Sequence, residues 1–598
     1  PPRPQPPTRR AAPPSDPRPP TPDSRPPTPD PMFPLAASLL GAFLFLGVGA
    51  YGLLALGVVY EAGLWWLLYI GGAVAGVIWG LCGRGEKALR ASVVLCLHAA
   101  LLFLAAFLGS LVTDIGWDSI ETHQRAVVLM GEGWNIVAPQ PGWIQSLPAD
   151  HFIRRADLFE AHLDFSILYP SALLFSELPF GFEGGKGYRF LLLLMAGLLA
   201  ATLVRAAGLG RSAAWLAGLF VAWNPVALFQ LWTLFMDFEV ALYASLALVA
   251  IYALSWRRDP RALVILAASL LLLALAKRSG PILAGAFASA FVLGWTVTAL
   301  RRGNLRWRTA GALAVIVVAA GFAVLRYGLP DHYAFDGRRL LGLVQEAVFE
   351  PNRIDEELMM RVPPSVDGLS RPEQFLRSLG ERTDIYRGAE LKPPLAWHPD
   401  EWAAYRNLRW PGHGSGGFGP LFSGALVLAL LAVGLALDRP SGPGRVLRGT
   451  LLLALAALAC VFPSWWARWV PFFWVLPLLL VLPVWKKRWR DPLPDRLYLA
   501  PGGGRALASL VGALALLVGL ANSVALTTVV TRHSFELTDR IDTIFASLPP
   551  EPIPLEPNRS YLVQRWFEER GLSWRAPRPN EVPQGRFPQL EAVWYGAE

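Results

Sequence analysis

The sequence is poor in charged residues and nearly devoid of cysteine. Only 17% of its 598 residues are charged, and its three cysteines are Cys82, Cys96 and Cys460. Because each cysteine lies in or beside an apolar run, neither a disulfide framework nor a thiolate metal site is indicated. A hydrophobic content of 54% and a mean hydropathy of +0.39 exclude a soluble globular chain. We therefore expect a polytopic membrane protein.

Phosphate-binding glycine motifs are also missing. No Walker-type loop and no GxGxxG element precedes an expected helix, so a reaction driven by ATP or a nucleotide sugar has no support. The glycine-rich stretches 442–445 and 501–505 are interpreted as turns between apolar runs. The formal net charge of +9 does not indicate a nucleic-acid partner, since the basic residues fall in short loops between alternate apolar runs.

Apolar runs dominate what is present. Runs long enough to cross about 30 Å of hydrocarbon as helices predict about thirteen transmembrane spans. They lie near residues 34–59, 64–82, 91–112, 188–207, 213–235, 238–255, 262–276, 280–300, 308–327, 421–437, 449–462, 466–485 and 505–530. With the N-terminus inside, every loop assigned to the cytoplasm is basic, as the positive-inside rule requires. The predicted fold class is an all-α polytopic bundle.

This topology divides the chain into five parts. A Pro-rich tail without a packed core precedes the first span, and Met32 is an alternative functional start. The parts are the disordered cytoplasmic tail 1–33, the N-terminal transmembrane module 34–327 with an outward loop 113–187, the large outward loop 328–420, the helices 421–530 and the outward segment 531–598. An amphipathic helix lying on the membrane is expected at 338–350.

The stretch "TDIGWDSIETHQ" (113–124) follows an outward-going span and contains Asp114, Asp118 and Glu121. In a helix, spacings of four and three would place these carboxylates on one face. A lone acid beside a membrane is usually the solvated end of a helix. Three acids beneath a long loop favour a catalytic role instead, since charge at this depth is costly and usually functional.

Polar residues gather at other outward ends. Lys277 and Arg278 interrupt an apolar region against the positive-inside bias, which favours an anionic ligand. Arg468 lies among tryptophans, where an interfacial belt with a snorkelling arginine is an equally good explanation. Asp237 and Glu239 occupy a short turn. Together these residues indicate a site in which cations bind a lipid-linked phosphate and a carboxylate acts as the base on an acceptor hydroxyl.

The order of these elements resembles the GT-C superfold of polyprenyl-phosphate-sugar-dependent glycosyltransferases, in particular the dolichyl-phosphate-mannose mannosyltransferases. "VTDIGW" resembles the family's acidic stretch at Asp114, and "SILYPSALLF" resembles a Leu-Val-Tyr-Pro-Ala element at Tyr169. "TLFMDFEVAL" is similar to a Leu-Phe-Asn-Asp turn at Asp237, and "LAKRSGPILAG" looks like the lysine-containing outer end. The resemblance covers about residues 90–300. Gly116, Met236 and the loop 328–420 depart from the family's pattern.

The resemblance implies an inverting sugar transfer, with mannose as one candidate, from a polyprenyl-phosphate donor to a glycan, lipid or protein acceptor. It places the active site at the extracytoplasmic face, and we expect a bacterial inner membrane. The expected catalytic carboxylates are Asp114, Asp118 and Glu121, the donor phosphate lies against Lys277, Arg278 and Arg468, and the sugar or acceptor contacts Asp237, Glu239, Tyr169 and His123. No cofactor is expected to be required and no metal ligand is assigned, although Asp237, Glu239 and Asp114 could hold a divalent cation.

Three other classes of function stay open, one of them a non-catalytic scaffold, against which the cations of "AKRSG" at an outward end argue. A lipid-linked-glycan flippase or another transporter would also have about thirteen spans, but should place its charges near the bilayer midplane. An O-antigen-ligase-like enzyme should depend on Arg and His in one large loop rather than on carboxylates after an early span. The sequence therefore favours the glycosyltransferase without excluding these alternatives.

Overall fold

The computed structural model of the protein describes most of the chain between residues 32 and 596. Outside the described residues lie 1–31, 83–86, 115, 117–118, 139–142, 144–164, 258, 278, 301–365, 381–391, 397, 400, 402–417, 437–444, 462–465, 491–502, 549–551, 555–566, 568, 576–581, 587–592 and 597–598. Nearly all of the tail 1–33, the expected span 308–327 and the expected amphipathic helix 338–350 therefore lie outside the described part of the chain.

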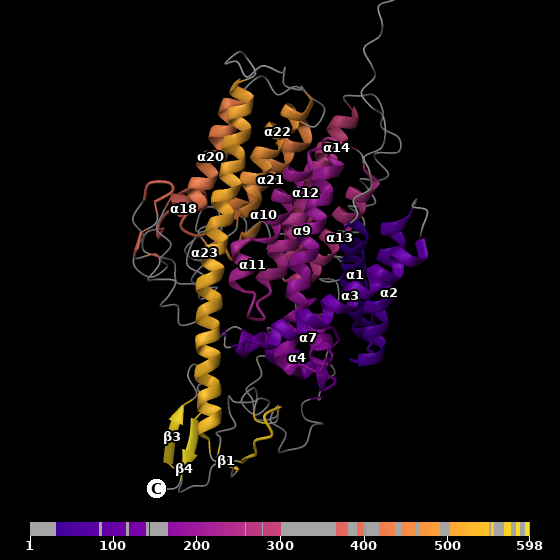
Figure 1. Ribbon diagram of the computed structural model, residues 1–598, viewed down its shortest axis with the longest axis vertical. Helices are drawn as coiled ribbons and strands as arrows, with labels where there is room; N and C mark the ends of the chain where they lie inside the picture. Colours follow the sequence, from indigo (N-terminus) through magenta and orange to yellow (C-terminus); the bar gives the residue numbers. More distant parts are fainter. Residues whose placement is uncertain are drawn as a thin grey trace, which may run out of the picture.

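The described residues are mostly helical (Figure 1). The helices are α1 (Phe33–Ala55), α2 (Ala62–Leu81), α3 (Lys87–Ser110), the π-helix η1 (Ser119–Gln124), α4 (Arg125–Gly131), α7 (Leu168–Ser176), α8 (Gly181–Gly184), the 3₁₀ turn η3 (Gly185–Gly187), α9 (Tyr188–Ala206), α10 (Arg211–Ala222), α11 (Pro225–Phe229), α12 (Asp237–Leu254), α13 (Pro260–Ala276), α14 (Gly280–Leu300), α18 (Arg371–Gly380), α20 (Phe422–Leu435), α21 (Arg445–Val461), the 3₁₀ turn η4 (Pro471–Val475), α22 (Leu476–Arg490) and α23 (Gly503–Ser547).

Seven of these helical stretches are long and apolar enough to cross a membrane. They are Phe33–Ala55, Ala62–Leu81, Ala88–Ser110, Gly181–Ala206, Asp237–Leu254, Gly280–Thr298 and Ala506–Ser547, and five shorter apolar helices accompany them. The prediction of a multi-pass, helical membrane protein is thereby confirmed. The count of thirteen spans stays a prediction.

Small strands are the exception to the all-helical expectation. Within the described residues, β1 (Ile553–Pro554) pairs in parallel with β2 (Trp574–Arg575), and β3 (Val582–Arg586) pairs antiparallel with β4 (Val593–Gly596). All four follow α23, and Figure 1 shows β1, β3 and β4 near the C-terminal end of this helix. The outward segment predicted at 531–598 is therefore partly built from short paired strands.

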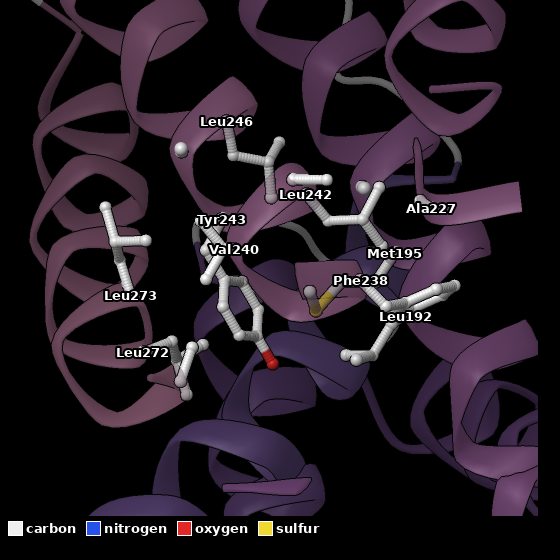
Figure 2. Close-up of a cluster of buried hydrophobic side chains, with 14 of the residues drawn as sticks. Leu192, Met195, Ala227, Phe238, Val240, Leu242, Tyr243, Leu246, Leu272 and Leu273 are labelled. Atoms are coloured by element: carbon white, nitrogen blue, oxygen red, sulfur yellow. The ribbon is translucent and has the colours of Figure 1, made fainter. Parts of the chain in front are cut away.

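Helix α12 forms the centre of the bundle. Because it is apolar on all sides below its first turn, it can be buried on all sides. Its side chains pack against α9, α11 and α13, as Figure 2 shows for Val240, Leu242 and Leu246 of α12, Leu192 and Met195 of α9, Ala227 of α11, and Leu272 and Leu273 of α13. The first residue of this buried helix is Asp237, so the core of the bundle fixes the position of a carboxylate.

Two of the expected spans have different limits. The run 213–235 is not one helix, because α10 ends at Ala222 and Asn224–Pro225 starts the separate short helix α11. The Asn224 side chain accepts a hydrogen bond from the Val226 N–H at 3.0 Å, and a proline in the first turn is favourable. Residues 230–236 then form an irregular segment, which we call the 230–236 segment.

The last span is also longer than predicted. It does not end at residue 530, because α23 continues without interruption to Ser547. At 1.5 Å per residue this 45-residue helix is about 68 Å long, more than twice the thickness of the hydrocarbon core. Its C-terminal part therefore extends past the bundle (Figure 1). Similarly, the run 466–485 becomes helical only at Pro471, after a turn at 466–469.

The segments predicted to face outward meet at one end of the bundle. The Thr113 N–H donates to Thr538 Oγ1 at 3.0 Å, and the Phe182 N–H donates to the carboxylate of Glu569 at 2.9 Å. At the other end, the Arg261 guanidinium lies 5.2 Å from the centre of the Phe33 ring. These contacts join segments that the sequence assigns to the same side, and the orientation of the bundle in the membrane stays a prediction.

We expect single cysteines at the two ends to differ in reactivity. In a variant with Cys82, Cys96 and Cys460 replaced by serine, a membrane-impermeant thiol reagent applied to intact cells should label Glu132→Cys and Arg540→Cys, which are exposed at the end assigned to the outside. It should not label Arg90→Cys or Arg211→Cys, which are exposed at the opposite end. The reverse pattern would invert the orientation, and labelling of one residue from each pair would show a miscounted span.

Candidate functional site

Asp114 is the buried centre of the first predicted stretch. Its side chain is 1% exposed, and three described groups donate to its carboxylate. The Gly116 N–H donates to Oδ1 at 3.0 Å, the Leu234 N–H donates to Oδ2 at 2.8 Å, and the Ser119 hydroxyl also donates to Oδ2. The carboxylate thus fastens the loop after α3 to the 230–236 segment. Asp114 is not a solvated helix end.

Asp114 does not lie on a helix, so it is not part of the predicted helical face. Residues 113, 114 and 116 are non-helical, and the π-helix η1 begins only at Ser119, because the Asp114 carboxylate bonds the Gly116 N–H in a tight local turn. Asp118 lies outside the described residues, and the side chain of Glu121 is not described. Asp114 is the acid of this stretch whose side chain the structure describes.

Two cations converge on Asp237. The Lys277 ammonium lies 2.6 Å from Oδ1, and the Arg468 guanidinium donates to Oδ2. The Asp237 carboxylate is buried at 2% exposure, whereas the side chains of Lys277 and Arg468 are 18% and 13% exposed. The sequence singled out all three residues, and the fold brings them together. Arg278 lies outside the described residues.

Aromatic rings lie against both cations. The Lys277 ammonium is 4.4 Å from the centre of the Trp469 ring, and the Arg468 guanidinium is 4.7 Å from the centre of the Phe235 ring. Trp466 also lies near Arg468, at 5.6 Å. Trp466 and Trp469 therefore lie against cations inside the site. The alternative, in which Arg468 snorkels from an interfacial aromatic belt, does not predict these contacts.

Arg189 organises the 230–236 segment from inside the bundle. It is fully buried at the start of α9, and all five of its N–H groups have acceptors. Three are the backbone carbonyls of Gln230, Thr233 and Phe235, the last at 2.6 Å. The remaining acceptors belong to the side chains beside it, Tyr188 and Glu239, at 3.2 and 3.4 Å.

The hydrogen bonds of Arg189 to the 230–236 segment help to position the carboxylates of Asp114 and Asp237. The segment that Arg189 holds presents the Leu234 N–H to Asp114 and leads directly into Asp237. The sequence analysis missed Arg189 and the buried Lys186, whose ammonium donates to the Glu183 carboxylate. The signal was available, since "GKGYRF" puts two basic residues at an outward end, against the same bias that drew attention to Lys277.

Glu239 is fully buried in the first turn of the membrane helix α12. Its Oε1 accepts from the Tyr188 hydroxyl and from Arg189, while its Oε2 has no partner among the described residues. The Tyr243 hydroxyl, one helical turn later, also lacks a described partner (Figure 2). The contact of Glu239 with a sugar stays a prediction, and its described partners Tyr188 and Arg189 belong to α9.

His123 and Tyr169 contact each other beside Phe235 of the 230–236 segment. His123 Nδ1 is 3.2 Å from the Tyr169 hydroxyl, and its ring centre is 6.2 Å from that of Phe235. Both side chains are buried, at 5% and 0% exposure. Two residues 46 positions apart thus meet beside the ring that contacts Arg468.

The arrangement provides a positioned carboxylate and a cation pair at one end of a helical bundle. Among the described residues no three His, Cys, Asp or Glu side chains converge as metal ligands would, and we assign none. Comparisons of the chain with protein-family models, with curated proteins and with solved structures find no match. The chain is a multi-pass, helical membrane protein by its own helices, and its function is argued from the site alone.

Proposed function

We propose that this protein is a GT-C-like membrane glycosyltransferase that moves a sugar from a polyprenyl-phosphate donor to a glycan, lipid or protein acceptor at the extracytoplasmic face, with inversion. The observation that carries the proposal is the pair Lys277 and Arg468, held on Asp237 at the same end of the bundle as the buried carboxylate of Asp114. The order of the motifs, which resembles that superfold, is the second support.

The cation pair suits a departing lipid phosphate. One ammonium N–H of Lys277 donates to Asp237, and the other two have no hydrogen-bond partner among the described residues. Both cations lie against the Asp237 carboxylate at the end of a span, the level at which the phosphate of a membrane lipid lies. In this proposal Asp237 positions the cations and does not contact the sugar.

Asp114 suits the role of general base. Three of the roughly four acceptor positions of its carboxylate are used by described donors, which leaves one on Oδ1 for an acceptor hydroxyl. That hydroxyl gives its proton to Asp114 while its oxygen bonds the anomeric carbon. The bond from that carbon to the phosphate oxygen breaks, and the electron pair leaves with the phosphate toward Lys277 and Arg468.

Removing Lys277 should weaken donor binding. A hydrogen bond to a charged group contributes roughly 1.5–3 kcal/mol, so Lys277→Ala should bind a polyprenyl-phosphate analogue about 10- to 100-fold more weakly. Arg532→Ala, which removes an exposed cation paired with Glu536 on α23, is the matched control and should bind normally. The measurement is competition by the analogue against a labelled donor. Equal affinity in the two variants would remove Lys277 from the site.

A transporter is the second candidate, because the interruption between α10 and α11 is of the kind that forms midplane sites in transporters. The discriminating experiment incubates the purified protein with a panel of polyprenyl-phosphate sugars, mannose first, and with lipid-linked acceptors. Product formation supports the glycosyltransferase. Movement of the lipid-linked sugar between leaflets of a reconstituted vesicle, without any transfer, would support the transporter instead.

A further inference from the structure

The C-terminal half of α23 contacts both of the segments that meet at Asp114. Helix α23 packs against α11 and then continues past the bundle (Figure 1). Thr531, Phe535 and Thr538 lie on one face of this helix, because spacings of four and three residues return to the same side. We call these three residues the α23 face. They belong to the part of the helix beyond residue 530, which the sequence did not predict to be part of a span.

One end of the α23 face holds the residue before Asp114. The Thr113 N–H donates to Thr538 Oγ1 at 3.0 Å. The Thr538 hydroxyl donates its own proton to the carbonyl of Ser534 at 2.9 Å, so its oxygen is free to accept. Because Thr113 is buried at 7% exposure, loss of this acceptor would leave the N–H of a buried residue without its partner.

The other end of the α23 face holds the 230–236 segment. The indole N–H of Trp232 donates to Thr531 Oγ1 at 2.9 Å. The same ring lies edge-on against Phe535, with ring centres 5.8 Å apart and ring planes at 71°. Trp232 is buried at 6% exposure. Helix α23 therefore holds this side chain through its polar N–H and through its apolar ring.

These contacts form a closed ring that includes the carboxylate. Asp114 directly follows the residue that Thr538 holds, and its Oδ2 accepts from the Leu234 N–H at 2.8 Å. Leu234 lies two residues after Trp232. The two threonines of the α23 face are seven residues apart, about 10.5 Å along a helix at 1.5 Å per residue. Helix α23 thus sets the distance between the loop after α3 and the 230–236 segment.

Residues after α23 hold Asp114 from a second side. The Glu569 carboxylate accepts a backbone N–H of α8 at 2.9 Å, and Glu183 of α8 accepts the Asp114 N–H at 3.1 Å. Arg570, next to Glu569, donates to the carboxylate of Asp542 on α23 at 2.6 Å. The part of the chain beyond residue 530 therefore reaches Asp114 by two separate routes.

We propose that the α23 face positions the Asp114 carboxylate against the 230–236 segment, and that Thr531 and Thr538 are positioning residues for the transfer reaction. The part of this inference that concerns transfer rests on the proposed function. Neither threonine is assigned a contact with donor or acceptor, since both act through the residues they hold. A general base must lie within hydrogen-bond reach of the hydroxyl it deprotonates, so a small displacement of Asp114 has a large effect.

The first test measures amide hydrogen exchange of the full chain in detergent by mass spectrometry. Thr538→Val keeps the branched shape but removes the hydroxyl. Exchange should become about fivefold faster at Thr113 and, through the ring, at Leu234, as for the loss of one hydrogen bond. Thr538→Ser, which keeps the hydroxyl, should exchange as the unaltered protein does. Thr543→Val is the matched control, because its exposed hydroxyl donates to the carbonyl of Asp539 within α23.

The second test measures single-turnover transfer from a polyprenyl-phosphate sugar. Thr538→Val should lower the rate about 10-fold, between the effect of one hydrogen bond and the 10²-fold that a misplacement of about 1 Å can cost. Donor affinity should not change, since Lys277 and Arg468 stay on Asp237. Thr538→Ser should retain the rate. Thr531→Val should act in the same direction from the other end of the α23 face, and it replaces Thr538→Val if that variant does not fold.

Each contrary outcome has a separate meaning. Faster exchange at Thr113 without a change at Leu234 would show a local contact and overturn the coupling. An equal effect of Thr543→Val would show a general loosening of α23. Faster exchange at both amides with an unaltered rate would show that the α23 face does not position the base. An unaltered protein without transfer activity would refute the proposed function, and the exchange rates would still decide whether α23 positions Asp114.

Discussion

Replacing Asp114 with asparagine should lower the rate of sugar transfer by about 10²–10⁴-fold, the usual contribution of a general base. Asparagine has nearly the shape of aspartate but cannot take a proton from the acceptor hydroxyl. The measurement is single-turnover transfer from a polyprenyl-phosphate sugar, which separates the chemical step from donor binding. Donor affinity should change little, since Lys277 and Arg468 stay in place.

The same substitution also has a structural cost that must be separated from chemistry. The carboxylate accepts from the N–H groups of Gly116 and Leu234, and an amide has one oxygen to offer them. Ser119→Ala is the matched control, because it removes a neutral donor from the same carboxylate. We expect Ser119→Ala to retain activity within about tenfold, as for loss of one hydrogen bond. Near-parental activity of Asp114→Asn would exclude Asp114 as the base.

Replacing Arg189 with methionine should destabilise the protein by about 3–5 kcal/mol, the usual consequence of removing one partner of a buried ion pair. Methionine keeps the apolar stem but leaves the Glu239 carboxylate without its cation. It also leaves the carbonyls of Gln230, Thr233 and Phe235 without their donor. The measurement is the midpoint of thermal unfolding in detergent, followed by tryptophan fluorescence.

A second substitution shows whether the loss is electrostatic. Adding Glu239→Gln to Arg189→Met removes the uncompensated charge, so the double variant should recover part of the lost stability. The recovery should be partial, because the three carbonyls still lack a donor. An unaltered unfolding midpoint in Arg189→Met would show that the 230–236 segment does not depend on this residue.

Much of the helical framework is predictable from the sequence because hydropathy is a local property. The runs 34–59, 64–82 and 238–255 correspond closely to α1, α2 and α12. The prediction of one span over 213–235 was wrong. The high mean hydropathy of the run hid the helix start at Asn224–Pro225. The rule that drew attention to Lys277 could also have found Arg189.

Composition and local pattern by themselves determined the class of the protein and the residues at which charge enters an apolar region. Only the tertiary structure decided which of those charges meet. Asp237 pairs with Lys277, 40 residues away, and with Arg468, 231 residues away, while Asp114 accepts from Leu234 across 120 residues. A hydropathy pattern gives the length of each helix but not its neighbours. The pairing of buried charges depends on which helix ends pack together, and that is set by contacts distributed over the whole bundle.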